Sequence, residues 1–492
     1  MNSKKTDSTG ENPHHSRRWK ILAFLALAQL MVVLDATIVN IALPSAQSDL
    51  GFGDADRQWI ITAYALAFGS LLLLGGRLAD YFGRKRTLIA GLLGFAGASA
   101  VGGLAPGFEV LVGARALQGM FGALLAPSAL STLTNTFTIA SERAKAFGVY
   151  GALAGGGGAI GLLLGGVLTE YLDWRWTMFV NVAFAIPAAI GLITLLVNDS
   201  RQGEMRVDIP GAVAASSGLF AIVFGFSRAE SDGWTAAVTL SSLAIGVGLL
   251  ALFVLIERRS AMPLLPARVV ADRNRAGSYL AVGVAGASMF GVFLFLTYYL
   301  QQTLGMSPVE TGLAFLPMIA FLMVGSISSS TRLMPRFGPR PLVPTGMVLA
   351  AAGMVWLTGV EVDSSYAGAV LPGLALVGAG FGLVIAPSMA SATLGVAASD
   401  SGVASAMVNT SQQVGGSVGT ALLSTISASA VTAFASGKVP SPELAAQAAV
   451  HGYTTAFWVS AAMLMAGAVV TAVTLRSGAP QTDDGHGLAM AH

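Results

Sequence analysis

Residues 76–86 read Gly76-Arg77-Leu78-Ala79-Asp80-Tyr81-Phe82-Gly83-Arg84-Lys85-Arg86, a short cation-rich stretch between two strongly apolar runs. A weaker copy stands 255 positions later, at residues 331–340, and reads Thr331-Arg332-Leu333-Met334-Pro335-Arg336-Phe337-Gly338-Pro339-Arg340. A polar loop that recurs once in each half of a very apolar chain predicts a duplicated membrane protein, and duplicated membrane proteins are often transporters.

The composition favours the same class. Apolar residues make up 54% of the chain and charged residues 11%, with a mean hydropathy of +0.70, whereas soluble domains carry about 25% charged residues. The chain has no cysteine, so a disulfide or a thiolate metal site is excluded. It also lacks the G-x-x-x-x-G-K-[ST] phosphate loop. We therefore expect no enzyme, no metal, no cofactor and no nucleic-acid partner.

Fourteen apolar segments of about 17–28 residues follow one another, each close to the length that crosses a bilayer. They begin near residues 21, 57, 87, 109, 144, 176, 209, 236, 276, 309, 341, 368, 402 and 451. With this count, 22 of the 27 Lys and Arg residues fall on the N-terminal side and four on the other. The positive-inside rule then places both termini in the cytoplasm.

Sequence repeats divide the spans into two halves. Ala126-Pro127-Ser128 recurs as Ala386-Pro387-Ser388, so spans 1–6 correspond to spans 9–14. The expected organisation is a cytoplasmic tail (1–20), a six-helix bundle (21–198), two inserted linker helices (199–260), a second six-helix bundle (261–476) and a cytoplasmic tail (477–492). Two like halves of equal orientation predict a pseudo-two-fold axis along the membrane normal.

Four motifs carry a family resemblance that covers nearly the whole chain. They are Leu34-Asp35-Ala36-Thr37-Ile38-Val39-Asn40-Ile41-Ala42-Leu43-Pro44, the loop at 76–86, the set Leu111, Arg115, Gln118 and Gly119, and Trp174-Arg175-Trp176 with Phe179 and Asn181. With these motifs the chain resembles the major facilitator superfamily, and within it the fourteen-helix drug–proton antiporters.

The resemblance implies a proton-coupled exporter of hydrophobic or cationic small molecules that works by alternating access. It implies a bacterial-type plasma membrane, a proton gradient as the energy source and a monomer in the lipid bilayer. The stretch Gly161-Leu162-Leu163-Leu164-Gly165-Gly166 lacks the family's proline, which leaves symport open beside antiport. The alternatives are a transporter of one endogenous metabolite, lipid or siderophore, and a non-transporting membrane sensor or intramembrane enzyme.

Asp35 is the acidic residue deepest within a predicted span, and Arg115 is the cation within one. Such residues usually mark ion or substrate pathways. Counted along their helices, the two lie at similar depths, so we expect a direct or water-bridged pair that couples transport to protons. The alternative is a static structural pair.

Two further groups are expected to act in conformational change. Gly76, Asp80, Gly83, Arg84 and Lys85 are predicted to form a latch, although topology anchoring explains the cations equally. A second set of glycines is predicted to form a gating seam, with ordinary close packing as the alternative. That set comprises Gly157, Gly158, Gly161, Gly165 and Gly166.

Substrate contacts are expected from aromatic and amide side chains in several spans. The candidates are Tyr64, Gln118, Phe290, Phe293, Tyr298, Asn409 and Gln412. Several of these aromatic side chains are equally explained by packing between helices or by an interfacial belt.

Overall fold

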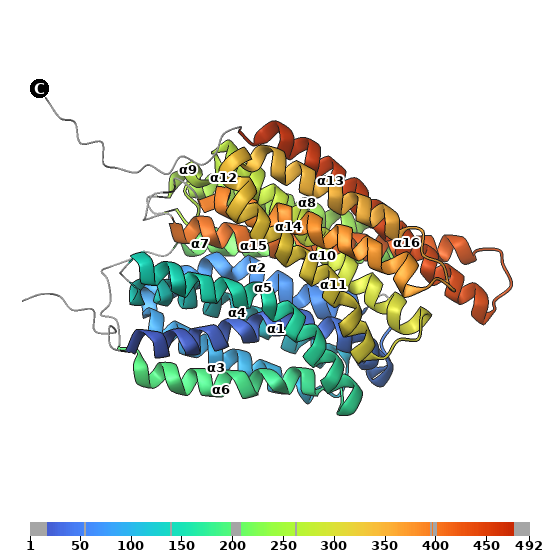
Figure 1. The fold of residues 1–492 in the computed structure, drawn as a ribbon, viewed down its shortest axis with the longest axis horizontal. Helices are drawn as coiled ribbons and strands as arrows, with labels where there is room; N and C mark the ends of the chain where they lie inside the picture. Colours follow the sequence, from blue (N-terminus) through green and yellow to red (C-terminus); the bar gives the residue numbers. More distant parts are fainter. Residues whose placement is uncertain are drawn as a thin grey trace, which may run out of the picture.

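The computed structural model describes residues 17–53, 56–137, 140–197, 208–260, 263–393, 396 and 401–476. Within these ranges every regular element is a helix and no strand occurs. Figure 1 shows the helices stacked side by side in two layers, with the early helices in one layer and most of the late ones in the other. The all-helical class was predicted, because a segment in lipid must satisfy its backbone hydrogen bonds internally.

Each of the predicted spans corresponds to a helix of 19 residues or more, and all but the last begin within a few residues of that helix's start. The first half contains α1 (Arg18–Leu50), α2 (Gln58–Phe82), α3 (Arg84–Gly103), α4 (Phe108–Thr136), α5 (Ala140–Tyr171) and α6 (Trp176–Leu195). The inserted pair is α7 (Ile209–Asp232) and α8 (Ala237–Arg259). The second half contains α10 (Arg273–Tyr298), α11 (Pro308–Ser328), α13 (Pro339–Leu357), α14 (Leu371–Thr393), α15 (Ser401–Ala435) and α16 (Pro442–Thr474). Two four-residue helices, α9 (Ala267–Val270) and α12 (Met334–Phe337), precede α10 and α13.

The number of membrane crossings is supported for part of the chain. Among the described residues, eleven helices are long and apolar enough to cross a bilayer. Shorter apolar stretches of α2, α5 and α7 lie at Gln58–Leu72, Gly157–Tyr171 and Pro210–Phe226. The count of fourteen spans therefore stays a prediction.

The last helix begins earlier than predicted. Its expected start was near residue 451, where the strongly apolar run begins, but α16 begins at Pro442. The Ser441 side chain accepts a hydrogen bond from the backbone N–H of Leu444, and Pro442 occupies the first helical position. These local capping signals begin the helix before the strongly apolar run, and hydropathy alone does not detect them.

The helices pack as two repeats joined at a few places. In the first half α1 packs on α5 and α6, and α4 packs on α2 and α3. The second half repeats this arrangement, because α10 packs on α15 and α16, and α14 packs on α11 and α13. The halves meet where α2 contacts α15 and where α5 contacts α11. The inserted helices α7 and α8 pack on each other, and α7 also contacts α2 and α15.

The cation-rich loop and its copy share one backbone feature. Gly83 between α2 and α3 has φ of 93°, and Gly338 between α12 and α13 has φ of 72°. Side chains other than glycine rarely adopt such angles. A left-handed residue at the same place in both repeats explains why glycine occurs in both loops.

The predicted gating seam divides between two neighbouring helices. Gly157, Gly161 and Gly165 face α1, where an added Cβ would come within 3.0 Å of a side chain in each case. Gly166 instead faces the start of α11 in the other half, where a Cβ would lie 2.7 Å from the Pro308 carbonyl oxygen. Gly158 has ordinary room, since its nearest atoms are 3.8 Å or more away. The structure therefore requires glycine for close packing at four of the five positions, and the gating role stays a prediction.

Candidate functional site

A buried ion pair joins α1 to α4. Arg115 Nη1 lies 2.6 Å from Asp35 Oδ2, and the two side chains are 2% and 0% exposed. The sequence predicted a direct or water-bridged pair, and the geometry is the direct one. Among the described residues Asp35 is the one buried carboxylate. Two charges this deep in an apolar bundle are costly unless they are paired and fully hydrogen-bonded.

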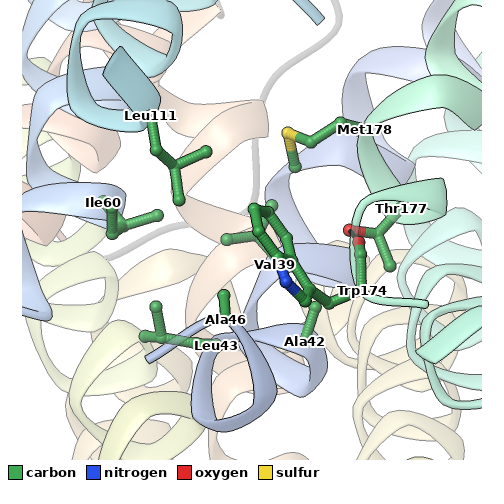
Figure 2. Close-up of a pocket in the computed structure, with 9 residues that line it drawn as sticks. All are labelled: Val39, Ala42, Leu43, Ala46, Ile60, Leu111, Trp174, Thr177 and Met178. Carbon is green, nitrogen blue, oxygen red and sulfur yellow. Dashed lines mark hydrogen bonds between the residues drawn. The ribbon is translucent and has the colours of Figure 1, made fainter. Parts of the chain in front are cut away.

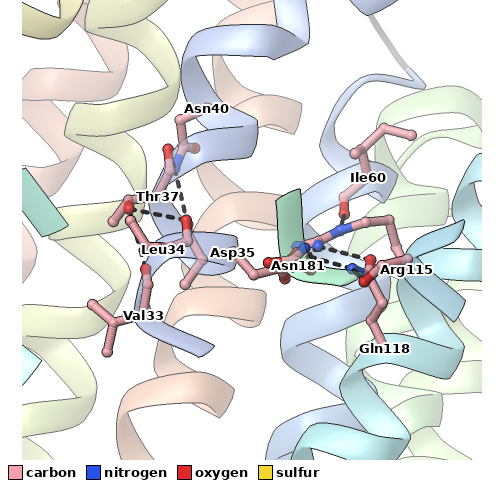
Figure 3. A network of polar contacts seen from close by, with 11 residues as sticks. Val33, Leu34, Asp35, Thr37, Asn40, Ile60, Arg115, Gln118 and Asn181 are labelled. Carbon is pink, nitrogen blue, oxygen red and sulfur yellow. Dashed lines mark hydrogen bonds and ion pairs between the residues drawn. The ribbon is translucent and has the colours of Figure 1, made fainter. Parts of the chain in front are cut away.

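Neutral amides complete the shell around Asp35 (Figure 3). Its Oδ1 accepts hydrogen bonds from Gln118 Nε2 at 2.9 Å and from Asn181 Nδ2 at 2.7 Å. Gln118 also donates to Ser99 Oγ at 2.7 Å and accepts from Arg115 Nη1 at 3.0 Å. The carboxylate is thus surrounded by three donors from α4 and α6. We refer to Asp35, Arg115, Gln118, Asn181 and Ser99 as the Asp35 network.

The Arg115 guanidinium is fixed on its other sides by α2. Its Nε donates to the backbone carbonyl oxygen of Ile60 at 3.1 Å, and its plane lies over the Tyr64 ring at 4.4 Å. Stacking on an aromatic face stabilises a desolvated cation. Tyr64, predicted as a substrate contact, is 2% exposed and is placed by the structure as the aromatic support of Arg115.

Gln118 was likewise predicted as a substrate contact, and the structure places it inside the Asp35 network. Sequence reasoning gave no role to Asn181 or Ser99. The spacing of Arg115 and Gln118, three residues apart on one helix, puts them on the same face and was a usable signal. Asn181 was visible as a motif residue, but nothing local linked α6 to a carboxylate 146 positions earlier.

An apolar cavity lies one helical turn beyond the Asp35 network (Figure 2). On α1, Val39 follows Asp35 by four residues, and on α4, Leu111 precedes Arg115 by four. The lining residues are Val39, Ala42, Leu43, Ala46, Ile60, Leu111, Trp174, Thr177 and Met178. Thr177 is the one lining residue with a hydroxyl group. Its hydroxyl donates to the Trp174 carbonyl oxygen at 2.6 Å. The mostly apolar lining therefore has few groups that could hold water next to the Asp35–Arg115 pair on the cavity side.

The remaining predicted substrate contacts are not gathered in one place. Phe293 packs on Phe315, with ring centroids 5.1 Å apart, in the apolar core of the second half. Tyr298 is fully buried and donates to the Gln47 side chain. Phe290 and Gln412 are half-buried, and Asn409 is exposed. Their contact with substrate stays a prediction.

The predicted latch is described in part. The side chain of Asp80 lies outside the described residues, as does that of Arg77. Lys85 donates from Nζ to the carbonyl oxygens of Ile193 and Leu196, where α6 ends. A cation at a helix C-terminus satisfies orphan carbonyls and favours the helix dipole. Both partners belong to the first half, so this contact anchors α3 to α6 and does not span the two halves.

Gly76 was predicted as a member of the latch, but the close approach of α2 to α4 at this place occurs at its neighbour Gly75. A Cβ at Gly75 would lie 2.0 Å from the Ala123 carbonyl oxygen of α4, whereas one at Gly76 would lie 3.8 Å from its nearest atom, in Pro127. Arg84 is half-buried at the start of α3. The latch function of these residues stays a prediction.

The halves are bonded together at the end of the bundle where α1 and α5 finish. Gln301 Nε2 donates to the Ile41 carbonyl oxygen at 3.1 Å, and the Arg57 guanidinium lies over the Tyr298 ring at 4.1 Å. Glu170 near the end of α5 accepts from the backbone N–H of Val309 at 3.0 Å. This last contact caps the N-terminus of α11 with a carboxylate from the other half.

Removing the Glu170 cap is expected to weaken the contact between the two halves at this end of the bundle. Such a cap typically contributes about 0.5–1 kcal/mol. Glu170→Ala should therefore raise the fraction of molecules whose halves are separated at this end roughly two- to fivefold. A cysteine at Ala42, which is 3% exposed, would report this as faster reaction with a thiol reagent in purified protein. Glu170→Gln keeps an acceptor oxygen and should label at nearly the parent rate. Equal labelling of the Ala and Gln variants would show that the cap does not hold the closure.

Comparisons with known proteins give the chain its relatives. The family profile described as Major Facilitator Superfamily matches residues 25–420. The puromycin resistance protein pur8 of Streptomyces alboniger is 50% identical over 471 residues, which cover 95% of this chain and 93% of that protein. The cephamycin export protein CmcT of Amycolatopsis lactamdurans is 38% identical over 468 residues, or 94% of each chain. The multidrug efflux pump LfrA of Mycolicibacterium smegmatis is 34% identical and covers 86% of this chain and 82% of its own.

Solved structures show the same fold at low identity. The POT family transporter PepTSo superposes with a TM-score of 0.68 at 15% identity, over 94% of this chain and 97% of that one. A bacterial homolog of the human lysosomal transporter Spinster, in an inward-facing and unoccupied conformation, has a TM-score of 0.64 at 15% identity. The alignment with it covers 93% of this chain and 96% of that one.

Proposed function

This chain belongs to the Major Facilitator Superfamily, and from that premise we propose that it exports antibiotic-like small molecules in exchange for protons. Membership makes it a membrane transporter and not an enzyme. The names of the relatives, which include a puromycin resistance protein, a cephamycin exporter and a multidrug pump, support efflux of small molecules. Within small-molecule drugs, we propose hydrophobic or cationic compounds as the substrate class.

The observation that carries the proton-coupling step is the buried Asp35–Arg115 pair. A carboxylate at this depth is a group that can hold a proton within the membrane, and such residues commonly form proton relays. In the ionised state Asp35 holds Arg115 at 2.6 Å. When Asp35 binds a proton, that attraction is lost, and the Arg115 side chain is free to exchange partners.

Exchange then follows from competition for one site. A cationic substrate that reaches the Asp35 carboxylate favours its ionised form and expels the proton. The two halves contact each other mainly where α2 meets α15 and where α5 meets α11, and alternating access requires two like halves that can change their relative orientation. The proton gradient supplies the energy, consistent with a sequence that has no nucleotide-binding loop.

The test is substrate-driven proton movement in everted membrane vesicles. Vesicles acidified by respiration receive puromycin or a lipophilic cationic dye, and a pH-sensitive probe follows the lumen. Addition of substrate should release protons from vesicles that contain the protein and not from matched vesicles that lack it. Substrate transport without any proton movement would contradict the proposed proton coupling. Absence of transport across a broad panel of compounds would contradict the proposed efflux.

The proposed orientation places both termini in the cytoplasm of a bacterial-type cell and rests on the 22-to-4 charge asymmetry. The chain has no native cysteine, so single cysteines report their side cleanly. Ser436, exposed after α15, is expected to react as cysteine with an impermeant reagent on intact cells. Arg86→Cys at the start of α3 should react only after permeabilisation. Reversed labelling of this pair would contradict the topology.

We propose a monomer as the functional unit.

A further inference from the structure

The Asp35 carboxylate is surrounded by groups that donate hydrogen bonds. Its Oδ2 accepts from Arg115, and its Oδ1 accepts from Gln118 and Asn181. This arrangement suits an ionised carboxylate, which is an acceptor only. A protonated carboxyl group carries an O–H donor, and burying that donor without an acceptor is unfavourable. Protonation of Asp35 therefore needs one of its three partners to become an acceptor.

Arg115 cannot become that acceptor, since a guanidinium has no acceptor atom. Gln118 is held in its present orientation from two sides. Its Oε1 accepts from Arg115 Nη1 at 3.0 Å, and its Nε2 donates to Ser99 Oγ at 2.7 Å. Turning this amide over would set its NH₂ group against the guanidinium.

Asn181 has no such restraint. Its Nδ2 donates to Asp35 at 2.7 Å, while its Oδ1 is buried and makes no hydrogen bond. The residue is 0% exposed, so this oxygen is not satisfied by bulk water. Buried side-chain acceptors without partners are uncommon in proteins, and each invites an explanation. A half-turn of the terminal amide would bring Oδ1 to the Asp35 carboxyl group and leave Nδ2 in the position that Oδ1 now holds.

We infer that Asn181 is a positioning residue for the transported proton: its amide donates to ionised Asp35 and, turned over, accepts from the O–H of protonated Asp35. The inference rests on the proposed proton coupling. The proton arrives from water and bonds to Oδ1, no other covalent bond changes, and the carboxyl group loses its negative charge. Each orientation satisfies the amide atom of Asn181 that faces Asp35, so the same side chain can serve both protonation states of the carboxyl group.

The groups that face Asp35 limit what else sets its protonation. Within the described residues, α4 presents the charged Arg115, and α2 presents Tyr64, which stacks on that guanidinium. The neutral residues Ser99, from α3, and Asn181, from α6, complete the network. On the α5 side, glycine faces this turn of α1. Among the side chains that the structure describes, no second carboxylate is buried there to accept the acid proton in place of Asn181.

The direction of a pH shift tests the inference. Asn181→Leu removes both functions, but the carboxylate keeps two donors whereas the acid loses its acceptor. The midpoint of substrate-driven proton release should therefore move to lower pH by about one unit, a tenfold loss of proton affinity. Asn181→Ser retains a hydroxyl that both donates and accepts, so its midpoint should lie between those of the parent protein and Asn181→Leu. A purely structural asparagine that only donates to the carboxylate predicts the opposite, a move to higher pH.

An infrared titration provides a readout that does not depend on transport. The C=O stretch of protonated Asp35, assigned by its absence in Asp35→Asn, should report a hydrogen-bonded acid in the parent protein. It should report a more weakly bonded acid in Asn181→Leu, and Asn181→Ser should restore part of that hydrogen bonding. An unchanged band and midpoint, or a midpoint moved to higher pH, would overturn the role of Asn181. Failure of the unmutated protein to release protons would instead overturn the proposed coupling, so the two failures are distinguishable.

Discussion

Asp35→Asn is expected to abolish export against a gradient and to eliminate substrate-driven proton release. Asparagine has nearly the shape of aspartate but cannot exchange a proton, so the exchange step is lost while the cavity keeps its form. The expected loss is complete for uphill transport, because no other described carboxylate is buried. Uphill accumulation in everted vesicles under a pH gradient measures it directly.

The same substitution also leaves Arg115 without its counter-ion. Breaking a buried pair by removing one partner costs about 3–5 kcal/mol, so Asp35→Asn protein should melt at lower temperature than the parent. The double variant Asp35→Asn/Arg115→Gln removes both charges and should recover much of the thermal stability. It should not recover uphill export, which separates coupling from folding.

Asp35→Glu gives the complementary result. It keeps a titrating carboxyl group at the cost of one methylene in a closely packed network, and should retain part of both export and proton release. Uphill pumping by Asp35→Asn would place the proton site elsewhere. The sequence suggests Glu109 and Glu310, but Glu109 is exposed, and Glu310 accepts from the Ser307 backbone N–H as part of a helix cap.

Much of the fold follows from the sequence because each helix is specified locally. Apolar runs of bilayer length set the helices, and the repeated Gly83 and Gly338 loops identify the two halves. Helix ends are set by finer signals, such as the Ser441 cap that begins α16 before the apolar run. The predicted boundary at residue 198 lies outside the described residues.

The candidate site was predictable to the extent that charge burial is costly. Asp35 and Arg115 stand out because charges in spans are rare, and their similar depth predicted the pair. Neutral partners carry no such signal, so Ser99 and Asn181 emerged only from tertiary packing. Tyr64 and Gln118 were predicted as substrate contacts, and their contact with Arg115 emerged only from the structure. Their contact with substrate stays a prediction.

Gly161→Ala is expected to have the second large effect, because it acts on the same turn of α1. A Cβ at Gly161 would lie 2.1 Å from Thr37 Oγ1 and 3.3 Å from the Leu34 Cα and carbonyl oxygen. Thr37 is held by hydrogen bonds from Oγ1 to the Val33 and Leu34 carbonyl oxygens at 3.1 and 3.2 Å. The contact is therefore relieved either by a change of the Thr37 χ1 rotamer, which breaks these hydrogen bonds, or by a wider separation of α5 from α1.

Overpacking of this kind costs about 1–3 kcal/mol, and it displaces the turn that carries Asp35. Gly161→Ala should therefore lower the melting temperature and reduce export to a small fraction of the parent rate. Gly158→Ala is the matched control on the same helix, since its Cβ would have no neighbour nearer than 3.8 Å. Export and thermal unfolding measured on this pair decide the matter, and equal behaviour of the two variants would show that close α1–α5 packing is not required at Gly161.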